Sequence, residues 1–208
     1  MRQYLMEFIG TMFLVLVMGF NGNPLAIGAV LIAMVYMGWH ISGAHYNPAI
    51  TLAVWIRKRI DFKNALAYIF AQLLGALAAS IVFYLVQERT FAPAPAVGVE
   101  IWKSILLELL FTFALCSVFL ELATTSKLKG NYVYGLAIGF TFLGAIYAIG
   151  GISGGVLNPA AAFGPQLMDS LEGGSGLSKF YIYFIGCFGG GALSAIVYKF
   201  LNPDEMKQ

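Results

Sequence analysis

The sequence predicts an all-α membrane protein with six transmembrane helices, two re-entrant half-helices and an inverted internal repeat. Three observations support this prediction: an apolar composition, six long apolar segments, and an Asn-Pro-Ala motif that occurs once in each half of the chain. Of the 208 residues, 60% are hydrophobic and 11% are charged, and the mean hydropathy is +0.81. A soluble domain of this length could not bury so much apolar surface, so lipid is the expected solvent.

Six apolar segments are long enough to cross a bilayer, whose hydrocarbon core requires about 20 residues of helix. These segments are residues 4–20, 25–41, 65–86, 101–120, 132–149 and 180–201. Two further apolar stretches, 47–56 and 158–168, are too short to span, and each begins with Asn-Pro. Because Asn caps helix N-termini and Pro favours the first helical turn, each stretch predicts a half-helix that begins at its motif.

The distribution of Lys and Arg predicts that both termini lie in the cytoplasm, because short cytoplasmic loops are rich in positive charge. The basic residues on the side of the termini are Arg2, Arg57, Lys58, Arg59, Lys63, Lys127, Lys129, Lys199 and Lys207. Those on the opposite side are Arg89, Lys103 and Lys179. Composition favours a bacterial inner membrane. The net charge of +2 is too small to indicate a nucleic-acid partner.

The two halves of the chain, about 1–86 and 101–201, repeat one pattern within a single transmembrane domain that covers residues 1–208. Each half has a Glu-x-x-x-Thr sequence, at Glu7 and Glu108, and a Ser-Gly pair upstream of its Asn-Pro-Ala motif. Each half contains three spans, an odd number, so the second half must be inverted in the membrane. Inverted repeats with interrupted helices place a site near the bilayer midplane.

The motif segments Ser42-Gly-Ala-His-Tyr-Asn-Pro-Ala-Ile-Thr51 and Asn158-Pro-Ala-Ala-Ala-Phe-Gly-Pro165 resemble the two signature loops of the aquaporin family, the major intrinsic proteins. The resemblance covers essentially the whole chain. It implies a right-handed bundle in which the half-helices meet at mid-membrane, and a homotetramer whose protomers each carry a pore. It also implies passive passage of water or small uncharged solutes, with membrane lipid as the surroundings and no cofactor.

The paired motifs are expected to form the centre of the pore. They consist of Asn47, Pro48, Ala49, Asn158, Pro159 and Ala160. Two helix N-termini that face each other carry partial positive charge and repel cations. The asparagine side chains would donate hydrogen bonds to a passing oxygen and so interrupt a proton-conducting chain of water. The backbone carbonyls expected to line the pore belong to Gly43, Ala44, His45, Gly154, Gly155 and Val156.

Glu7 and Glu108 are carboxylates within apolar segments, where a charge without partners is costly. They could serve as a proton relay, as in a transporter. The resemblance instead implies a bracing role, in which each carboxylate accepts hydrogen bonds from backbone N–H groups of the adjoining re-entrant loop. We favour the bracing role.

The expected selectivity filter departs from the family pattern. Family members usually have Arg directly after the second Asn-Pro-Ala motif, and this chain has Ala161. The three other filter positions correspond to Ile27, Ile146 and Gly155. Small and apolar side chains at these places predict a wide filter without a fixed positive charge. Neutral molecules such as ammonia, urea, glycerol or undissociated metalloid acids therefore become plausible solutes beside water, with water secondary as one alternative.

Two alternatives of other classes follow from the same pattern. An ion-coupled secondary transporter also uses inverted repeats and broken helices, but it requires midplane carboxylates, for which the only deep candidates stand at helix starts. A structural role with a closed pore is the other. The sequence contains no nucleophile–base set or phosphate loop, so no catalytic residue is predicted. Cys116 and Cys187 stand far apart in apolar runs and are interpreted as buried free thiols, so no metal site is predicted.

Overall fold

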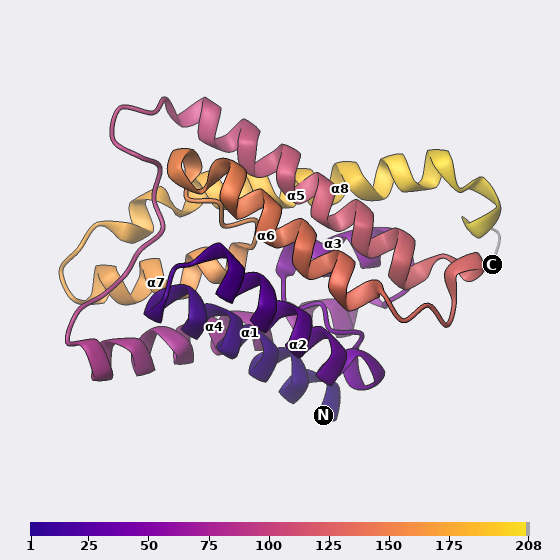
Figure 1. Cartoon of the computed structure of the whole chain (residues 1–208), viewed down its shortest axis with the longest axis horizontal. Helices are drawn as coiled ribbons and strands as arrows, with labels where there is room; N and C mark the ends of the chain where they lie inside the picture. The colour runs from indigo at the N-terminus through magenta and orange to yellow at the C-terminus, as the bar shows by residue number, and fades with distance from the viewer. Residues whose placement is uncertain (207–208) are drawn as a thin grey trace.

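The computed structural model describes residues 1–206 and consists of helices joined by short connections (Figure 1). Six helices are long and apolar enough to cross a membrane. These are α1 (Arg2–Phe20), α2 (Pro24–Ser42), α4 (Phe62–Gln87), α5 (Ile101–Thr124), α6 (Tyr134–Ser153) and α8 (Phe180–Leu201). The predicted spans are confirmed, with differences of a few residues at their ends. Lys207, which entered the charge count, lies outside the described residues.

The two short helices begin where the Asn-Pro motifs predict. They are α3 (Pro48–Ile56) and α7 (Pro159–Leu171), and each starts at the proline of its motif. Three 3-10 turns complete the described secondary structure: η1 (Ser126–Leu128), η2 (Gly176–Lys179) and η3 (Pro203–Met206). The chain is therefore an all-α bundle with six spanning helices and two re-entrant half-helices, as predicted.

The two ends of the bundle differ in the connections that they carry. In Figure 1, α1 begins at the bottom of the view, right of centre, and η3 lies at the far right, on the side where the connections 57–61 and 125–133 also lie. We call this end the terminal side. The long connection 88–100, drawn in magenta, lies at the left of the same view. We call that end the loop side.

The repeat is visible in how the helices pack. The most extensive helix contacts join α1 to α4 in the first half and α5 to α8 in the second. Both crossings need a glycine, because a Cβ at Gly75 would lie 2.4 Å from the Phe8 carbonyl oxygen, and one at Gly190 would lie 2.4 Å from that of Leu109. Such close backbone approach at small residues is typical of membrane helix pairs.

Each half-helix packs against the last helix of the opposite half. The α3 helix contacts α8, and α7 contacts α4. A Cβ at Gly191 would lie 2.6 Å from the Ala49 carbonyl oxygen, and one at Gly164 would lie 2.5 Å from the backbone of Ala76. These contacts between a half-helix of one half and a spanning helix of the other hold the two halves together. They bring the two Asn-Pro-Ala motifs face to face in the middle of the bundle.

Candidate pore

The amides of Asn47 and Asn158 connect the two halves at the centre of the protein. Each side-chain oxygen caps its own half-helix, accepting from the backbone N–H of Ala49 at 2.8 Å and of Ala160 at 3.0 Å. One N–H of the Asn47 amide donates to the Leu157 carbonyl at 2.8 Å, and one N–H of Asn158 donates to the Tyr46 carbonyl at 2.9 Å. A primary amide has two such hydrogens. One hydrogen of each amide therefore stays available for a molecule between them.

A small central cavity lies between the two asparagines. Its volume is about 10 Å³, which is room for about one water molecule. The polar groups in its wall come from Asn47, Asn158, His45 and Tyr46, and the rest of the wall is apolar. The arrangement can present two amide donors to an oxygen atom, while the apolar part of the wall offers no hydrogen-bond partner.

The loops before the two motifs share an unusual backbone. Ala44 and Tyr46 in the first loop have φ angles of 52° and 51°, and Gly155 and Leu157 occupy the matching places in the second with 61° and 51°. Residues other than glycine rarely adopt this left-handed conformation, so surrounding contacts must hold them there. The backbone groups of these loops are thereby turned away from any helical ladder.

The Glu7 carboxylate supplies part of that support in the first half. It is fully buried and accepts hydrogen bonds from the Ser42 hydroxyl at 2.6 Å, the His45 N–H at 3.0 Å and the Tyr46 N–H at 2.6 Å. The Gln72 amide of α4 donates a fourth bond at 2.8 Å. A buried carboxylate is tolerated when hydrogen bonds satisfy its lone pairs, and Glu7 meets this condition.

Glu108 makes the matching contacts in the second half. It is also fully buried and accepts from the Ser153 hydroxyl at 2.7 Å, the Val156 N–H at 3.0 Å and the Leu157 N–H at 2.8 Å. Its fourth neighbour is the Cys187 thiol at 3.8 Å. Neither Glu108 nor Glu7 lines the central cavity. Both carboxylates are therefore occupied by loop donors at a distance from the path.

The two histidines of the chain, His40 and His45, lie in different surroundings. The imidazole of His45 lies 3.1 Å from the Thr51 hydroxyl and makes edge contacts with the rings of Tyr68 and Phe119. His45 is buried and lines the central cavity. His40, in contrast, is exposed at the terminal end of α2.

Three of the four predicted filter residues come together at the loop side. Ile27 from α2, Ile146 from α6 and Gly155 from the second loop line one cavity of about 230 Å³. The fourth, Ala161, is fully buried in the first turn of α7 and is not among the residues that line this cavity. Val156 is also fully buried, and the cavity wall in its loop is formed by Gly154 and Gly155.

Another part of this wall comes from a connection that carries no motif of the repeat. Phe91, Ala92 and Pro93 of the connection 88–100 also line the loop-side cavity. The connection is held in place because the Gln166 amide donates to the Pro93 carbonyl at 2.7 Å, and the Ala96 N–H donates to the Ile152 carbonyl at 2.9 Å. Residues distant in sequence thus complete the wall of the cavity. The repeated motifs alone do not predict this contribution.

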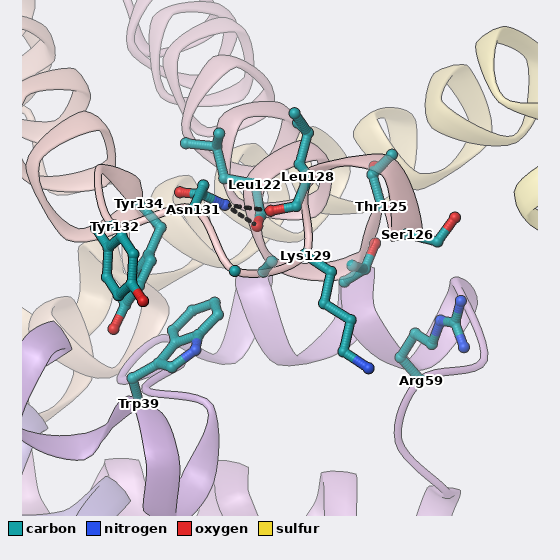
Figure 2. A pocket seen from close by; sticks show the side chains of 13 residues that line it. Trp39, Arg59, Leu122, Thr125, Ser126, Leu128, Lys129, Asn131, Tyr132 and Tyr134 are labelled. Carbon is teal, nitrogen blue, oxygen red and sulfur yellow. Dashed lines mark hydrogen bonds between the residues drawn. The ribbon is translucent and has the colours of Figure 1, made fainter.

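A third and larger cavity opens at the terminal side, with a volume of about 610 Å³. Figure 2 shows Trp39 beside Tyr132 and Tyr134, with the cationic side chains of Lys129 and Arg59 farther along the wall. The loop that covers this cavity is held by the Asn131 amide, which donates to the carbonyls of Leu122 and Leu128 (Figure 2). The three cavities lie in series from the loop side to the terminal side.

One member of the basic cluster predicted at the terminal side is buried. Arg57 is 2% exposed and pairs with the Glu205 carboxylate at 3.3 Å, whereas Arg59 is half-exposed and lies 3.8 Å from the same group. Glu205 also accepts hydrogen bonds from the N–H and hydroxyl of Ser126. These Ser126 bonds, followed by the two guanidinium groups, hold the pKa of Glu205 below its usual range. The basic cluster thus contains one buried, paired arginine beside one half-exposed arginine.

Comparisons with known proteins agree with this geometry. The family model described as major intrinsic protein matches residues 1–198. The chain is 36% identical to Aquaporin AqpM of Methanothermobacter marburgensis over 86% of this chain and 76% of that protein. It is 34% identical to Glycerol uptake facilitator protein-like 6 of Lactiplantibacillus plantarum over 99% and 100%.

Among solved structures, the fold resembles that of the aquaglyceroporin from Plasmodium falciparum. The TM-score is 0.84 at 21% identity, and the match covers 100% of this chain and 99% of that one. Fold, repeat and family model therefore agree. The chain belongs to the major intrinsic protein family, and it is an integral multi-pass membrane protein that acts as a passive channel for water and small solutes and not as an enzyme.

Proposed function

We propose that this channel passes water together with small neutral solutes such as urea, glycerol, ammonia or undissociated metalloid acids. The observation that carries the proposal is the composition of the loop-side cavity, whose wall contains Ile27, Ile146 and Gly155 and no charged side chain. Ala161 stands where family members usually have Arg, so no fixed cation screens the entrance. Relatives named as an aquaporin and as a glycerol uptake facilitator are consistent with both kinds of permeant.

Exclusion of ions and protons is assigned to the centre of the pore. The N-termini of α3 and α7 both begin at the central cavity, and their partial positive charges oppose the entry of cations. The free N–H groups of Asn47 and Asn158 would bind the oxygen of a passing water. That water would then orient its own hydrogens away from the centre, and the chain of proton transfer would be interrupted.

Glu7 and Glu108 brace the two pore loops in this proposal. Their bonds to backbone N–H groups hold the strained loops in position and turn loop carbonyls toward the path. The carbonyls assigned to the path are those of Gly43, Ala44, His45, Gly154, Gly155 and Val156. Solutes that lose water of hydration would find acceptors there, because the side chains of the filter offer none.

The terminal side is assigned to the cytoplasm. Most Lys and Arg residues of the short connections lie on that side, which is the pattern of cytoplasmic loops. A bacterial inner membrane is the proposed location. A homotetramer, in which each protomer has its own pore, is the proposed assembly because the resemblance to the family implies it.

Stopped-flow light scattering on proteoliposomes tests the filter assignment. We expect wild type to pass water, urea and glycerol, and Ala161→Arg to keep water flux while losing solute flux. Ala161→Leu adds bulk without charge and is the matched control. Comparison of the two variants shows whether solutes are excluded by the added charge or by a narrower filter. Fluxes should rise in proportion to the gradient and should not require a proton or sodium gradient. Wild-type vesicles that pass water and no solute would contradict the proposal.

A further inference from the structure

Two stripes of side chains run along the pore from the loop side to the terminal side. Ile27 and Ile146 line the loop-side cavity, and Leu31 and Phe142, one turn farther along α2 and α6, line the central cavity. Residues four apart lie on one helix face, so both stripes continue in the same direction. Their full members are Ile27, Leu31, Val35 and Trp39 on α2, and Ile146, Phe142, Ile138 and Tyr134 on α6.

The third members of the two stripes are buried side chains between the central and the terminal-side cavities. Val35 and Ile138 are 0% and 1% exposed, and neither is among the residues lining the three cavities described above. The fourth members, Trp39 and Tyr134, line the terminal-side cavity. The α2 and α6 side chains are therefore packed closely between the central and the terminal-side cavities.

Aromatic rings from three helices meet at the terminal end of this closely packed region. Trp39 stacks on Tyr134 with 4.0 Å between ring centroids and an interplanar angle of 27°. Phe119 of α5 lies 6.2 Å from Trp39 and 5.4 Å from the imidazole of His45, and it is 2% exposed. Leu115, one turn before Phe119, lines the central cavity. Phe119 thus stands between the central cavity and Trp39 (Figure 2 shows Trp39 and Tyr134).

We propose that Trp39, Phe119 and Tyr134 form a second constriction at the terminal side of the pore, which sets the largest solute that the channel passes. This inference rests on the proposed function, because a pore with a wide loop-side filter needs another place to select by size. Large rigid rings that hold one another by stacking resist displacement by a solute. The loop-side wall, in contrast, contains the side-chain-free Gly154 and Gly155.

Flux of polyols of increasing length into proteoliposomes measures the largest solute that the channel passes. Glycerol, a four-carbon polyol and a five-carbon polyol are compared for wild type, Trp39→Ala, Trp39→Phe and Phe119→Leu. We expect wild type to pass glycerol and exclude the two larger polyols. Trp39→Ala should raise the flux of the four-carbon polyol roughly tenfold, with a smaller change in water flux. Trp39→Phe, which keeps an aromatic ring, should restore most of the exclusion.

Trp102→Ala is the matched control, because Trp102 is exposed at the loop side of α5, away from the path. It should keep the wild-type limit. Water flux shows which variants are folded, and if Trp39→Ala loses it, Phe119→Leu decides the question. Unchanged polyol fluxes in a folded variant would overturn the second constriction while leaving the proposed function intact. If wild type excludes urea and glycerol but Trp39→Ala admits them, the proposed function fails and the second constriction stands.

Discussion

The two pore loops present nearly identical contacts to their carboxylates, yet the layer behind each carboxylate differs in polarity. Glu7 and Glu108 each accept bonds from one serine hydroxyl and two successive backbone N–H groups. Behind Glu7, the Gln72 amide donates to the carboxylate and also to the Thr51 hydroxyl, at 2.8 and 3.0 Å. Behind Glu108, the matching donor among the described residues is the Cys187 thiol, at 3.8 Å.

The shared contacts are the ones that a re-entrant loop requires. Backbone N–H groups at membrane depth have no water to bind, and a loop outside a helix cannot satisfy them internally. One carboxylate with two oxygens meets several of them at once. The contacts that differ involve the next helix, where a polar amide and a thiol both suffice because the loop donors already satisfy most of the carboxylate.

The largest expected effect comes from replacing the carboxylates. Glu7→Gln and Glu108→Gln each keep one acceptor oxygen, so at least one buried N–H of the loop loses its partner. We expect each change to lower the free energy of unfolding by about 3 kcal/mol, with the larger loss for Glu7→Gln, because the new amide would face that of Gln72. Thermal unfolding in detergent measures the loss, and the exposed Glu88→Gln serves as control. A folded Glu108→Gln protein that only loses proton-coupled uptake would indicate a relay instead.

The second effect tests whether the helix crossing of the first half and that of the second half are packed equally closely. Gly75→Ala and Gly190→Ala both place a Cβ 2.4 Å from a backbone oxygen of the neighbouring helix, so the helices must move apart. We expect a similar loss of about 2 kcal/mol from each, seen as a lower melting temperature. Gly144→Ala in α6 is the control, because its Cβ would meet nothing within 4 Å. Unequal losses would show that the two helix crossings contribute differently to stability despite their similar geometry.

A smaller effect addresses the layer behind the carboxylates directly. Gln72→Met keeps the shape of the side chain and removes two hydrogen bonds, so we expect a loss of about 1 kcal/mol. Cys187→Ser places a better donor behind Glu108 and should cost less than that. Chemical or thermal unfolding of the two variants in parallel makes the comparison. If Cys187→Ser proved the more harmful change, the apolar character of the second half would matter more than its hydrogen bonds.

The smallest effect concerns the terminal side, where α3 ends at the buried Arg57. Because the pKa of Glu205 is lowered in the folded state, its contribution to stability is present above the ordinary pKa of 4.5. It is lost as pH falls through the lower folded value. Glu205→Gln should therefore reduce the melting temperature at neutral pH, and the difference from wild type should shrink as pH falls below about 4. A difference that stays constant with pH would contradict this assignment.

Prediction from sequence succeeded for features that depend on residues close together in the chain. Apolar length predicted the spans, and Asn-Pro predicted the starts of α3 and α7. It did not reveal the burial of Arg57, because the partner of this charge, Glu205, lies 148 residues away in the chain. It also missed Phe91, whose connection shows no pattern beyond nearby prolines. Neither contact can be recognised from the sequence around the residues that make it.

The sequence by itself determined the membrane-spanning character, the number of spanning helices and the starts of the two half-helices, since hydropathy and capping act over a few turns. Only the tertiary structure decided which side chains line each cavity. It placed Ala161 behind the wall, brought Phe91 into it, and stacked Trp39 on Tyr134. The physical reason is that the shape of a pore depends on contacts between helices distant in sequence, and the periodicity of any one helix does not specify them.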